Sequence, residues 1–392
     1  MRILQVINIG YLAGGAESSV FSIRDELNRR GHIVRVLSSD FPGGKMLSDY
    51  QVERIPMASI FKALHHIFYW RSYLTMLRII KDFRPDIIHF HTVAAFSPSI
   101  FLAIGNIPAV MTVHGPEEFT LRLLPWFLPV QDYNDTGEPF DLKNLNVVGR
   151  FRYWYYCFIQ RPLYRLLMRR IRYFIAPSAF LAEALRDDVP PAKIRQLYNG
   201  IDLPPTMPLP HSRGILYMGR LEKVKGVDYL IRAFARVVDK DPRVELSIVG
   251  DGSERARLES LTKELGLSDN VAYSGWLSSR EEIAEEYGKS SVVVIPSIWP
   301  ENLPTVCIEA FAAGRPVIGT RAGGIPELVE DGKTGYVVPI KNAAAISEAI
   351  LTILQDEETL ARMSREARMK ALDFDMHHFL DQLEALYKEA SL

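Results

Sequence analysis

Short apolar segments alternate with longer amphipathic segments along most of the chain, and this alternation constrains the fold more than any other feature. Twelve segments have the length and β-branched composition of buried strands. They are 3–8, 33–38, 86–91, 109–114, 173–178 and 194–199, then 214–219, 244–250, 270–275, 291–297, 316–320 and 335–339. Helical patterns lie between them, as at 16–30, 226–238, 253–265 and 304–313. This order indicates an α/β fold with parallel sheets covered by helices on both faces.

A proline-rich segment divides the chain into two parts. Residues 203–212 hold four prolines in ten positions, which is typical of a linker. Twelve strands are too many for one typical open sheet. We therefore predict two doubly wound parallel-sheet domains, 1–202 and 213–374, with a hinge at 203–212. A helix at about 375–392 closes the chain and can pack back on the N-terminal domain.

The composition excludes several classes of protein. With 48% apolar and 24% charged residues, extensive disorder is not expected. Cys157 and Cys307 lie far apart, which excludes a disulfide scaffold and a cysteine-based metal site and fits a reducing compartment. No segment matches a signal peptide or the roughly 20 apolar residues of a membrane span. We therefore expect a cytoplasmic protein.

The formal net charge of −1 conceals an uneven distribution. Its near-neutral value argues against general nucleic-acid binding. Residues 1–195 hold 24 basic and 17 acidic side chains, a balance of +7. The remainder holds 22 basic and 30 acidic side chains, a balance of −8. An anionic membrane or acceptor would therefore bind the first part.

The first turn between a strand and a helix reads NIGYLAGGAES and contains Gly14 and Gly15. Glycine lets the backbone approach a ligand closely, and the helix N-terminus presents unpaired N–H groups to an anion. The dinucleotide fingerprint G-x-G-x-x-G is absent, which disfavours an NAD enzyme. The pattern indicates either an anion site or a tight turn that needs glycine for its own geometry.

A second turn, MGRLEKVKGVDYL, follows the first strand of the second half. Arg220 and Lys225 come just after the carboxyl end of the strand, where open α/β sheets bind ligands. Two cations there can clamp a diphosphate, the guanidinium as a fork and the ammonium as a point charge. A solvated charged loop is the alternative.

The segment 296–320 contains two glutamates eight positions apart. Glu301 lies in the loop after a buried strand, and Glu309 lies in the helix that begins just after it. That helix is otherwise apolar, so the carboxylate of Glu309 needs a partner, which ribose hydroxyls or a structural ion pair would supply. The N–H groups of Thr305 and Val306 at the helix N-terminus would meet a phosphate.

Two histidines end strand patterns in the first domain. His91 and His114 both follow carboxyl ends, and the turn TVHG suits a hydrogen bond from His114 to a sugar hydroxyl or a phosphate. A histidine with a purely local hydrogen bond is the alternative. No spacing such as H-E-x-x-H occurs, so we expect no metal.

The motifs, taken together, resemble those of the family 4 retaining glycosyltransferases, also described as glycosyl transferases group 1. The matching pieces are GGAE at 14–17, TVHG at 112–115, NGID at 199–202, GRL and KG within 219–226, GDG at 250–252, Glu301 with Glu309, GRPVIGT and GGIPELV within 314–329, and TGYVVP at 334–339. The second domain matches best. In such families the first domain carries the acceptor site.

The resemblance implies a GT-B architecture, in which two Rossmann-like domains face an interdomain cleft. It also implies transfer of a sugar from a UDP- or GDP-sugar to a hydroxyl of a glycan, a lipid-linked or a small-molecule acceptor, with retention. No cofactor or metal is expected. A role in glycan, polysaccharide or glycolipid biosynthesis follows from the family.

The resemblance assigns roles to five charged or polar residues. Arg220 and Lys225 bind the donor diphosphate, and Glu309 binds the donor ribose. Glu301 contacts the transferred sugar, and His114 lies beside the sugar and the phosphate. We take Glu301, His114, Arg220 and Lys225 as the catalytic set, without assigning Glu301 as a nucleophile.

Further residues are expected to bind the donor. The amides of Thr305 and Val306 meet the phosphate, the loop Gly14–Gly15 closes over the diphosphate, and Gly250 and Leu303 lie at the same site. Many relatives have a Phe-Gly pair after the first glutamate, where this chain reads ENLPT.

Other functions share parts of this pattern. A nucleotide-sugar epimerase or a phosphorylase can have the same architecture, and a non-catalytic nucleotide-sugar-binding protein is a further alternative. Analysis of the products separates these from transfer, because an epimerase needs no acceptor and a phosphorylase consumes phosphate.

Two segments combine basic and aromatic residues. Residues 150–173 contain seven arginines, five tyrosines, a tryptophan and no acid, and 61–81 have a similar character. Such segments are typical of contact with an anionic membrane surface, here the inner face. The alternative is a buried aromatic helix with a solvated arginine edge.

Overall fold

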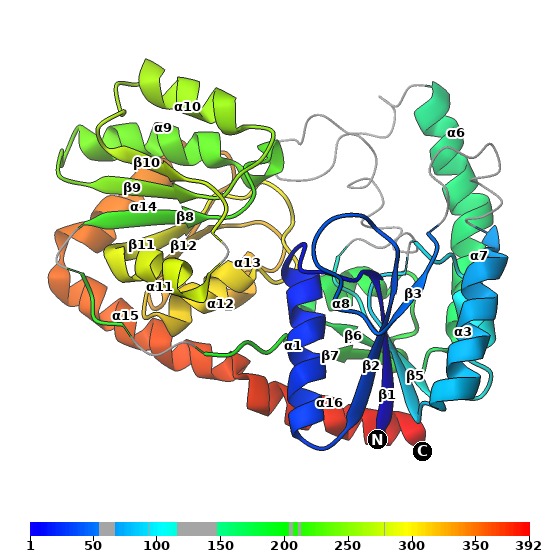
Figure 1. Cartoon of the computed structure of the whole chain (residues 1–392). Helices are drawn as coiled ribbons and strands as arrows, with labels where there is room; N and C mark the ends of the chain where they lie inside the picture. The colour runs from blue at the N-terminus through cyan, green and yellow to red at the C-terminus, as the bar shows by residue number, and fades with distance from the viewer. Residues whose placement is uncertain (55–66, 94, 116–146, 204–206, 211–212, 278) are drawn as a thin grey trace. The chain divides into compact units, whose positions relative to one another are not determined.

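Two compact units make up the described part of the chain (Figure 1). The computed structural model describes residues 1–54, 67–93, 95–115, 147–203, 207–210, 213–277 and 279–392, apart from the side chains of 148, 149, 152, 153 and 156. Within these ranges the first unit comprises the residues up to Gly200 together with His377–Leu392, and the second comprises Ile201–Met376. Each unit is built on its own parallel sheet.

The sheet of the first unit has the strand order β3-β2-β1-β4-β5-β6-β7, and all neighbouring strands are parallel. The strands are β1 (Arg2–Ile9), β2 (Ile33–Ser39), β3 (Tyr50–Val52), β4 (Ile87–Phe90), β5 (Ala109–Thr112), β6 (Tyr173–Ala176) and β7 (Ile194–Gln196). Every residue of β4 and β5 is buried, as expected for central parallel strands. The strand order reverses between β1 and β4, and open α/β sheets bind ligands beside such a switch point.

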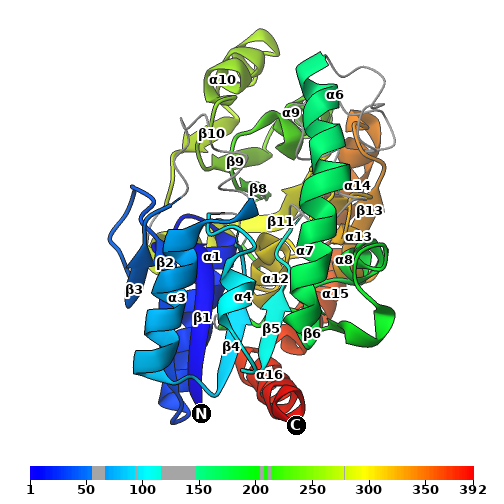
Figure 2. The same ribbon diagram turned by 90° about the vertical axis from the view of Figure 1, so that its right-hand side faces the viewer.

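Helices cover this sheet. They are α1 (Gly15–Arg29), α3 (Trp70–Phe83), α4 (Ile100–Ala103), α6 (Val147–Tyr155), α7 (Arg161–Leu167), α8 (Ala179–Leu185) and α16 (Met376–Ser391). A π-helical turn, Tyr156–Gln160, joins α6 to α7 in one continuous run. Figure 2 shows this run with α3 and α4 in one layer that faces the viewer.

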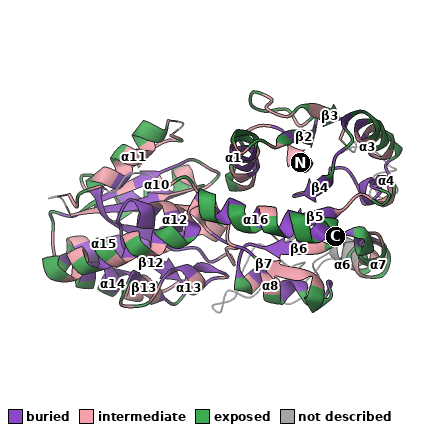
Figure 3. Ribbon diagram, turned by 90° about the horizontal axis from the view of Figure 1, so that it is seen from below, coloured by how far each residue is buried: buried purple, intermediate pink, exposed green. Residues whose placement is uncertain are grey.

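The C-terminal helix α16 packs against the first unit. The hydroxyl of Tyr387 lies 2.6 Å from Nδ1 of His89 on β4. Glu389 accepts hydrogen bonds from Tyr173 on β6 at 2.6 Å and from Arg195 on β7 at 3.0 Å. The helix has one buried and one exposed face (Figure 3). The chain therefore ends on the unit with which it began.

The sheet of the second unit has the order β10-β9-β8-β11-β12-β13, again with parallel neighbours. The strands are β8 (Gly214–Met218), β9 (Glu245–Val249), β10 (Val271–Ser274), β11 (Ser290–Ile295), β12 (Val317–Thr320) and β13 (Gly335–Val338). The helices are α9 (Val227–Val238), α10 (Arg255–Glu264), α11 (Arg280–Lys289), α12 (Thr305–Ala312), α13 (Ile325–Leu328), α14 (Ala343–Gln355) and α15 (Glu357–Ala371). The strand order reverses between β8 and β11.

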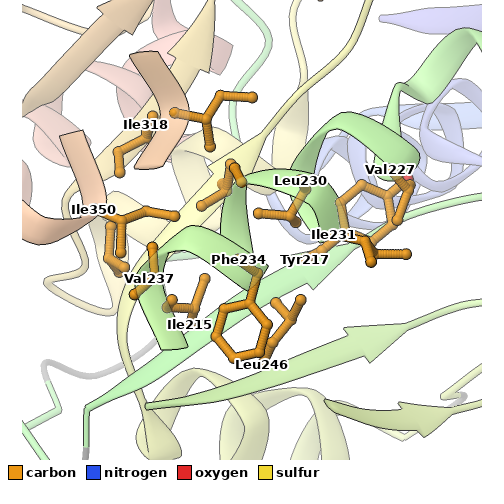
Figure 4. Close-up of a cluster of buried hydrophobic side chains, with 14 of the residues drawn as sticks. Ile215, Tyr217, Val227, Leu230, Ile231, Phe234, Val237, Leu246, Ile318 and Ile350 are labelled. Atoms are coloured by element: carbon orange, nitrogen blue, oxygen red, sulfur yellow. The ribbon is translucent and has the colours of Figure 1, made fainter. Parts of the chain in front are cut away.

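The core of the second unit explains why α9 forms where it does. Leu230, Phe234 and Val237 recur at three- and four-residue spacing, so they line one side of the helix. They join Ile215 of β8 and Leu246 of β9 in one buried cluster (Figure 4). Burying a side chain of this size contributes about 1.5–3 kcal/mol each. This packing holds α9, and the turn that precedes it, against the sheet.

The structure confirms the predicted α/β fold with two parallel sheets. Each of the twelve predicted segments contains a strand, and the prediction missed only the three-residue β3 among the strands of the described residues. Of the basic aromatic segments, 61–66 lie outside the described residues, while 67–81 and 150–173 belong mainly to α3 and the α6–α7 run. None of the helices in the described ranges is long and apolar enough to cross a membrane.

Candidate active site

Three turns at the carboxyl ends of β8, β9 and β11 form the frame of the candidate site in the second unit. Gly226, after β8, has φ of 65°, and a Cβ atom on it would lie 2.2 Å from the carbonyl oxygen of Pro296. Gly250, after β9, has φ of 131°, and a Cβ atom on it would lie 2.0 Å from the carbonyl oxygen of Gly219. A side chain at either position would push the turns apart, so both positions require glycine.

Lys225 and Glu301 form an ion pair within this frame. Lys225 ends the 3₁₀ turn Lys223–Lys225 after β8, and Glu301 lies in the loop between β11 and α12. Nζ of Lys225 lies 2.6 Å from Oε1 of Glu301, which also accepts a hydrogen bond from Oγ of Ser297 at 2.7 Å. The side chains are 22% and 13% exposed, so a ligand can reach both charges.

Backbone hydrogen bonds fix the loop that carries Glu301. The N–H of Ile298 donates to the carbonyl of Val224 at 2.9 Å, which ties the loop to the turn after β8. The N–H of Gly324 donates to the carbonyl of Glu301 at 2.6 Å, which ties it to the turn after β12. The position of the carboxylate is therefore set by the scaffold before any ligand binds.

Glu309 lies on α12 and is bound by a buried tyrosine. Oε2 of Glu309 accepts a hydrogen bond from the hydroxyl of Tyr287 on α11 at 3.0 Å. Burial raises the pKa of Glu309, and hydrogen bonds from Tyr287 and Thr305 oppose that rise. Burial and the nearby Glu309 raise the pKa of Tyr287 well above its ordinary value, so the phenol keeps its proton and remains a donor.

Arg315, at the turn between α12 and β12, supports this arrangement. The residue is fully buried, and its Nε donates to the carbonyl of Tyr287 at 2.8 Å. Its Nη2 donates to the carbonyl of Pro208 at 2.7 Å and its Nη1 to that of Met207 at 3.4 Å. Burial lowers the pKa of Arg315 to about 10, so the side chain stays charged at neutral pH. Arg315 thus connects the proline-rich segment with the helix that carries Tyr287.

The N-terminus of α12 and Arg220 provide further positive charge. Pro304 precedes α12 and gives no side-chain cap. The first N–H groups of a helix, here from Thr305 and Val306, have no acceptor within the helix and carry its partial positive charge. Arg220 is exposed, and its carbonyl accepts a hydrogen bond from the buried Tyr217 at 2.8 Å. An anion is the ligand that these groups would attract.

The first unit contains three of the predicted residues. Gly14 and Gly15 are exposed at the N-terminus of α1, where Gly14 has no side chain to cap the helix and its carbonyl accepts a hydrogen bond from the N–H of Ser18 at 3.0 Å. His114 follows β5 and is partly buried. These glycines have the geometry of an uncapped helix start that faces solvent.

A row of neutral histidines leads from α16 to His114. Nε2 of His89 lies 2.7 Å from Oγ1 of Thr112, while its Nδ1 contacts Tyr387. The rings of His89 and His91 lie 4.1 Å apart, and Nδ1 of His91 lies 2.9 Å from Nε2 of His114. Burial lowers the pKa of His89 to about 3, that of His114 to about 4, and that of His91 well below its ordinary value. His114 is therefore uncharged at neutral pH.

Among the predicted residues, Lys225 and Glu301 are in direct contact, and Glu309 is close to Thr305. Leu303 is buried in the loop that carries Glu301.

Sequence reasoning missed Ser297, Tyr287 and Arg315. Ser297 follows the carboxyl end of a buried strand, as Arg220 and Glu301 do. Arg315 lies within the GRPVIGT motif, but the motif gave it no individual role. Tyr287 lies on a neighbouring helix and carries no local signal. The described residues contain no group of three or more His, Cys, Asp or Glu side chains suited to a metal ion.

Family models match both halves of the chain. Residues 210–370 match the model described as glycosyl transferases group 1, and residues 13–204 match the model described as glycosyltransferase family 4. The chain is also 30% identical over 337 residues to alpha-D-kanosaminyltransferase from Streptomyces kanamyceticus, a match that covers 82% of each protein. The chain belongs to the family 4 glycosyltransferases.

Other relatives of this family 4 glycosyltransferase match part of it or share its fold. D-inositol 3-phosphate glycosyltransferase from Corynebacterium efficiens is 31% identical over 189 residues, which is 46% of this chain and 44% of that enzyme. Sucrose-phosphate synthase from Thermosynechococcus elongatus superposes with a TM-score of 0.76 at 21% identity, over 99% of this chain and 98% of that one. Anabaena HepE in complex with UDP superposes with a TM-score of 0.72 at 19% identity, over 99% and 100%. The two superpositions show the GT-B fold.

Proposed function

We propose that this glycosyltransferase moves a sugar from a nucleoside diphosphate sugar, linked to UDP or GDP, to an acceptor hydroxyl with retention of configuration. The observation that carries the proposal is the partly exposed pair of Lys225 and Glu301 at the carboxyl ends of β8 and β11. HepE of Anabaena, 19% identical, has been solved with UDP and with UDP-glucose, which supports a nucleotide sugar as the donor.

In this proposal the leaving diphosphate is bound by positive groups of the second unit. Arg220 and Lys225 neutralise its charge, and the N–H groups of Thr305 and Val306 donate to a phosphate oxygen. These interactions strengthen as the diphosphate gains charge in the transition state, so they accelerate the reaction rather than only bind the substrate. They also make a metal unnecessary, and we propose that none takes part.

The sugar and the nucleoside are assigned to other residues. Glu301 accepts hydrogen bonds from hydroxyls of the transferred sugar, and Glu309 accepts them from the ribose. The backbone at Gly250 and the loop at Leu303 shape the same pocket. From the first unit, His114 donates to the sugar or phosphate, and the Gly14–Gly15 turn offers N–H groups to the diphosphate.

The chemical step exchanges one bond to the anomeric carbon for another. The bond from this carbon to the phosphate oxygen breaks, and a bond to the acceptor oxygen forms on the same face of the sugar. The acceptor loses its proton to the departing phosphate oxygen, so no protein nucleophile is needed. Both catalytic cations act on the leaving group, where negative charge develops.

We further propose that the acceptor is a glycan, a lipid-linked molecule or a small hydroxyl compound in the biosynthesis of a polysaccharide or glycolipid. The reaction would then take place in the cytoplasm, at the inner face of a membrane when the acceptor is lipid-linked. The exposed aromatic residues of α6 support this location.

Product analysis tests the proposal. The protein is incubated with radiolabelled UDP- and GDP-sugars and with lipid extracts or simple glycosides as acceptors. We expect release of the nucleoside diphosphate together with a labelled glycoside of the donor's anomeric configuration. An isomerised sugar formed without acceptor, a sugar phosphate formed at the expense of inorganic phosphate, or binding without turnover would contradict it.

A further inference from the structure

The helical run α6–α7 of the first unit has an exposed apolar face. Phe151, Trp154 and Phe158, here called the aromatic stripe, are 64%, 49% and 68% exposed. Their ring centroids lie 6.1 Å apart for Phe151 and Trp154 and 5.8 Å apart for Trp154 and Phe158. The three rings therefore form one continuous surface along the helix. Leu166, further along the run on α7, is 56% exposed.

The other side of the same run is already packed. Gln160, Tyr164 and Met168 recur every four residues and are buried. Tyr164 makes an edge-to-face contact with Phe101 of α4, with ring centroids 6.5 Å apart. The run is thus anchored to the first unit by one face, and the aromatic stripe is not needed to hold it there.

The α6–α7 run itself carries basic and no acidic side chains, and the carboxylate of Asp188 beside it is already paired with Arg161 at 2.6 Å. No acidic residue occurs from 150 to 173, whereas Arg150, Arg165, Arg169 and Arg170 are exposed. Arginine side chains can reach past neighbouring rings to lipid phosphates. Phenylalanine and tryptophan rings enter the boundary between headgroups and acyl chains.

A second exposed stripe lies in the same layer of helices. Trp70, Leu74 and Leu77 of α3 are 53%, 48% and 38% exposed, with Arg78 and Lys81 beside them on the surface. Figure 2 shows α3, α4 and the α6–α7 run in one layer. Each stripe thus combines exposed apolar side chains with exposed basic ones. A bilayer that contains anionic lipid offers a matching partner for both kinds of side chain.

We propose that this layer of the first unit docks on a bilayer rich in anionic lipid, with the aromatic stripe inserted at the headgroup boundary. The proposal extends the proposed function, since docking would bring the enzyme to a membrane-held acceptor. Docking itself requires neither donor nor acceptor, so it can be measured separately.

Co-sedimentation of the full chain with vesicles tests the proposal. The vesicles contain phosphatidylcholine alone or with about 30% phosphatidylglycerol, at low and high salt. We expect binding only to the anionic vesicles, weakened by salt. The double variant Phe151→Ser with Phe158→Ser should bind at least tenfold more weakly, and Arg165→Ala with Arg169→Ala should lose most of the preference for anionic lipid.

The control is Trp276→Ser, an equally exposed aromatic residue of the second unit at 63% exposure, which should bind as the wild type does. Circular dichroism and thermal melting confirm that each variant is folded. Equal binding of wild type to both vesicle types, or wild-type binding by the double variant, would overturn the proposal. So would a stable homodimer that the double variant dissociates. The double variant should bind nucleoside diphosphates as tightly as the wild type does. Loss of membrane docking with unchanged nucleotide binding would therefore concern this proposal alone and not the proposed function.

Discussion

Nζ of Lys225 lies 2.6 Å from Oε1 of Glu301, and the same oxygen accepts a hydrogen bond from Ser297. The pair joins two turns that are 76 residues apart in the chain. The carboxylate holds the ammonium group among the turns after β8, β9 and β11, where we propose that the donor diphosphate binds. A preorganised cation loses little freedom when an anion arrives, which favours a role in catalysis over one in stability alone.

Removing the charge of Lys225 should reduce turnover strongly. For Lys225→Met we expect a loss of about 100-fold or more in kcat, because one preorganised interaction with developing charge is typically worth that much. Lys223→Met is the matched control, since Lys223 lies in the same 3₁₀ turn and is exposed. Release of nucleoside diphosphate from the donor measures both. Equal losses of kcat in Lys225→Met and Lys223→Met would indicate a general effect of positive charge and would contradict a specific contact of Lys225 with the diphosphate.

The hydroxyl of Tyr287 should matter for donor affinity. Tyr287→Phe removes a hydrogen bond to the carboxylate of Glu309, which is worth about 1.5–3 kcal/mol when the acceptor is charged. If Glu309 binds the ribose, KM for the donor should rise about fivefold or more with little change in kcat. Tyr273→Phe is the control, because its hydroxyl bonds to Thr262 at 2.8 Å, apart from the site. An unchanged KM for the donor in Tyr287→Phe would contradict the assignment of Glu309 to the ribose.

Arg315 should be important for stability. Arg315→Met leaves three carbonyl groups, those of Tyr287, Met207 and Pro208, without their donor. The bond to Tyr287 is buried, whereas Met207 is half-buried and Pro208 exposed, so water can replace the arginine at these two carbonyls. One buried group left unpaired costs about 1–3 kcal/mol, and we expect the free energy of unfolding to fall by that amount. The exposed Arg321 offers a control as Arg321→Met, with a change near zero. Denaturant unfolding measures both, and hydrogen exchange should be faster at the amides of Met207 and Leu209 in Arg315→Met only.

The buried histidines should make the first unit sensitive to acid. Burial lowers the pKa of His89 to about 3 and that of His114 to about 4, whereas a histidine in an unfolded chain titrates near 6.5. Below pH 6.5 the unfolded chain therefore binds more protons than the folded one, and the free energy of unfolding falls as the pH is lowered. Each proton contributes about 1.4 kcal/mol per pH unit.

Calorimetry between pH 7 and pH 5 follows this loss. His91→Leu removes one buried titrating group and should make the dependence on pH shallower by up to one proton. A pH dependence that is the same in wild type and His91→Leu would show that His91 is not held neutral by burial.

Much of the fold could be predicted from the sequence, because the strands of parallel sheets are buried on both faces and appear as short apolar runs. β3 was missed since Tyr50–Val52 has three residues and is an edge strand. α16 could be predicted as a helix, yet nothing local indicates that Tyr387 would contact His89, 298 residues earlier.

The candidate site was accessible to sequence reasoning only in part. Positions after the carboxyl ends of strands identified Arg220, Lys225 and Glu301 as candidates, because all parallel strands end at one edge of a sheet. The direct contact of Lys225 with Glu301 depends on how two turns pack around Gly226. Spacing along the chain contains no information about that packing.

Binding of nucleoside diphosphates tests the central claim most directly. Titration calorimetry of the wild type with UDP, GDP and ADP, and of Arg220→Ala, Lys225→Ala and Lys223→Ala with the same compounds, needs no knowledge of the sugar or the acceptor. We predict that at least one of the three compounds binds the wild type. That compound should bind Arg220→Ala and Lys225→Ala at least tenfold more weakly, and Lys223→Ala with the affinity of the wild type. Absence of binding by all three compounds, or wild-type affinity in both Arg220→Ala and Lys225→Ala, would contradict the account.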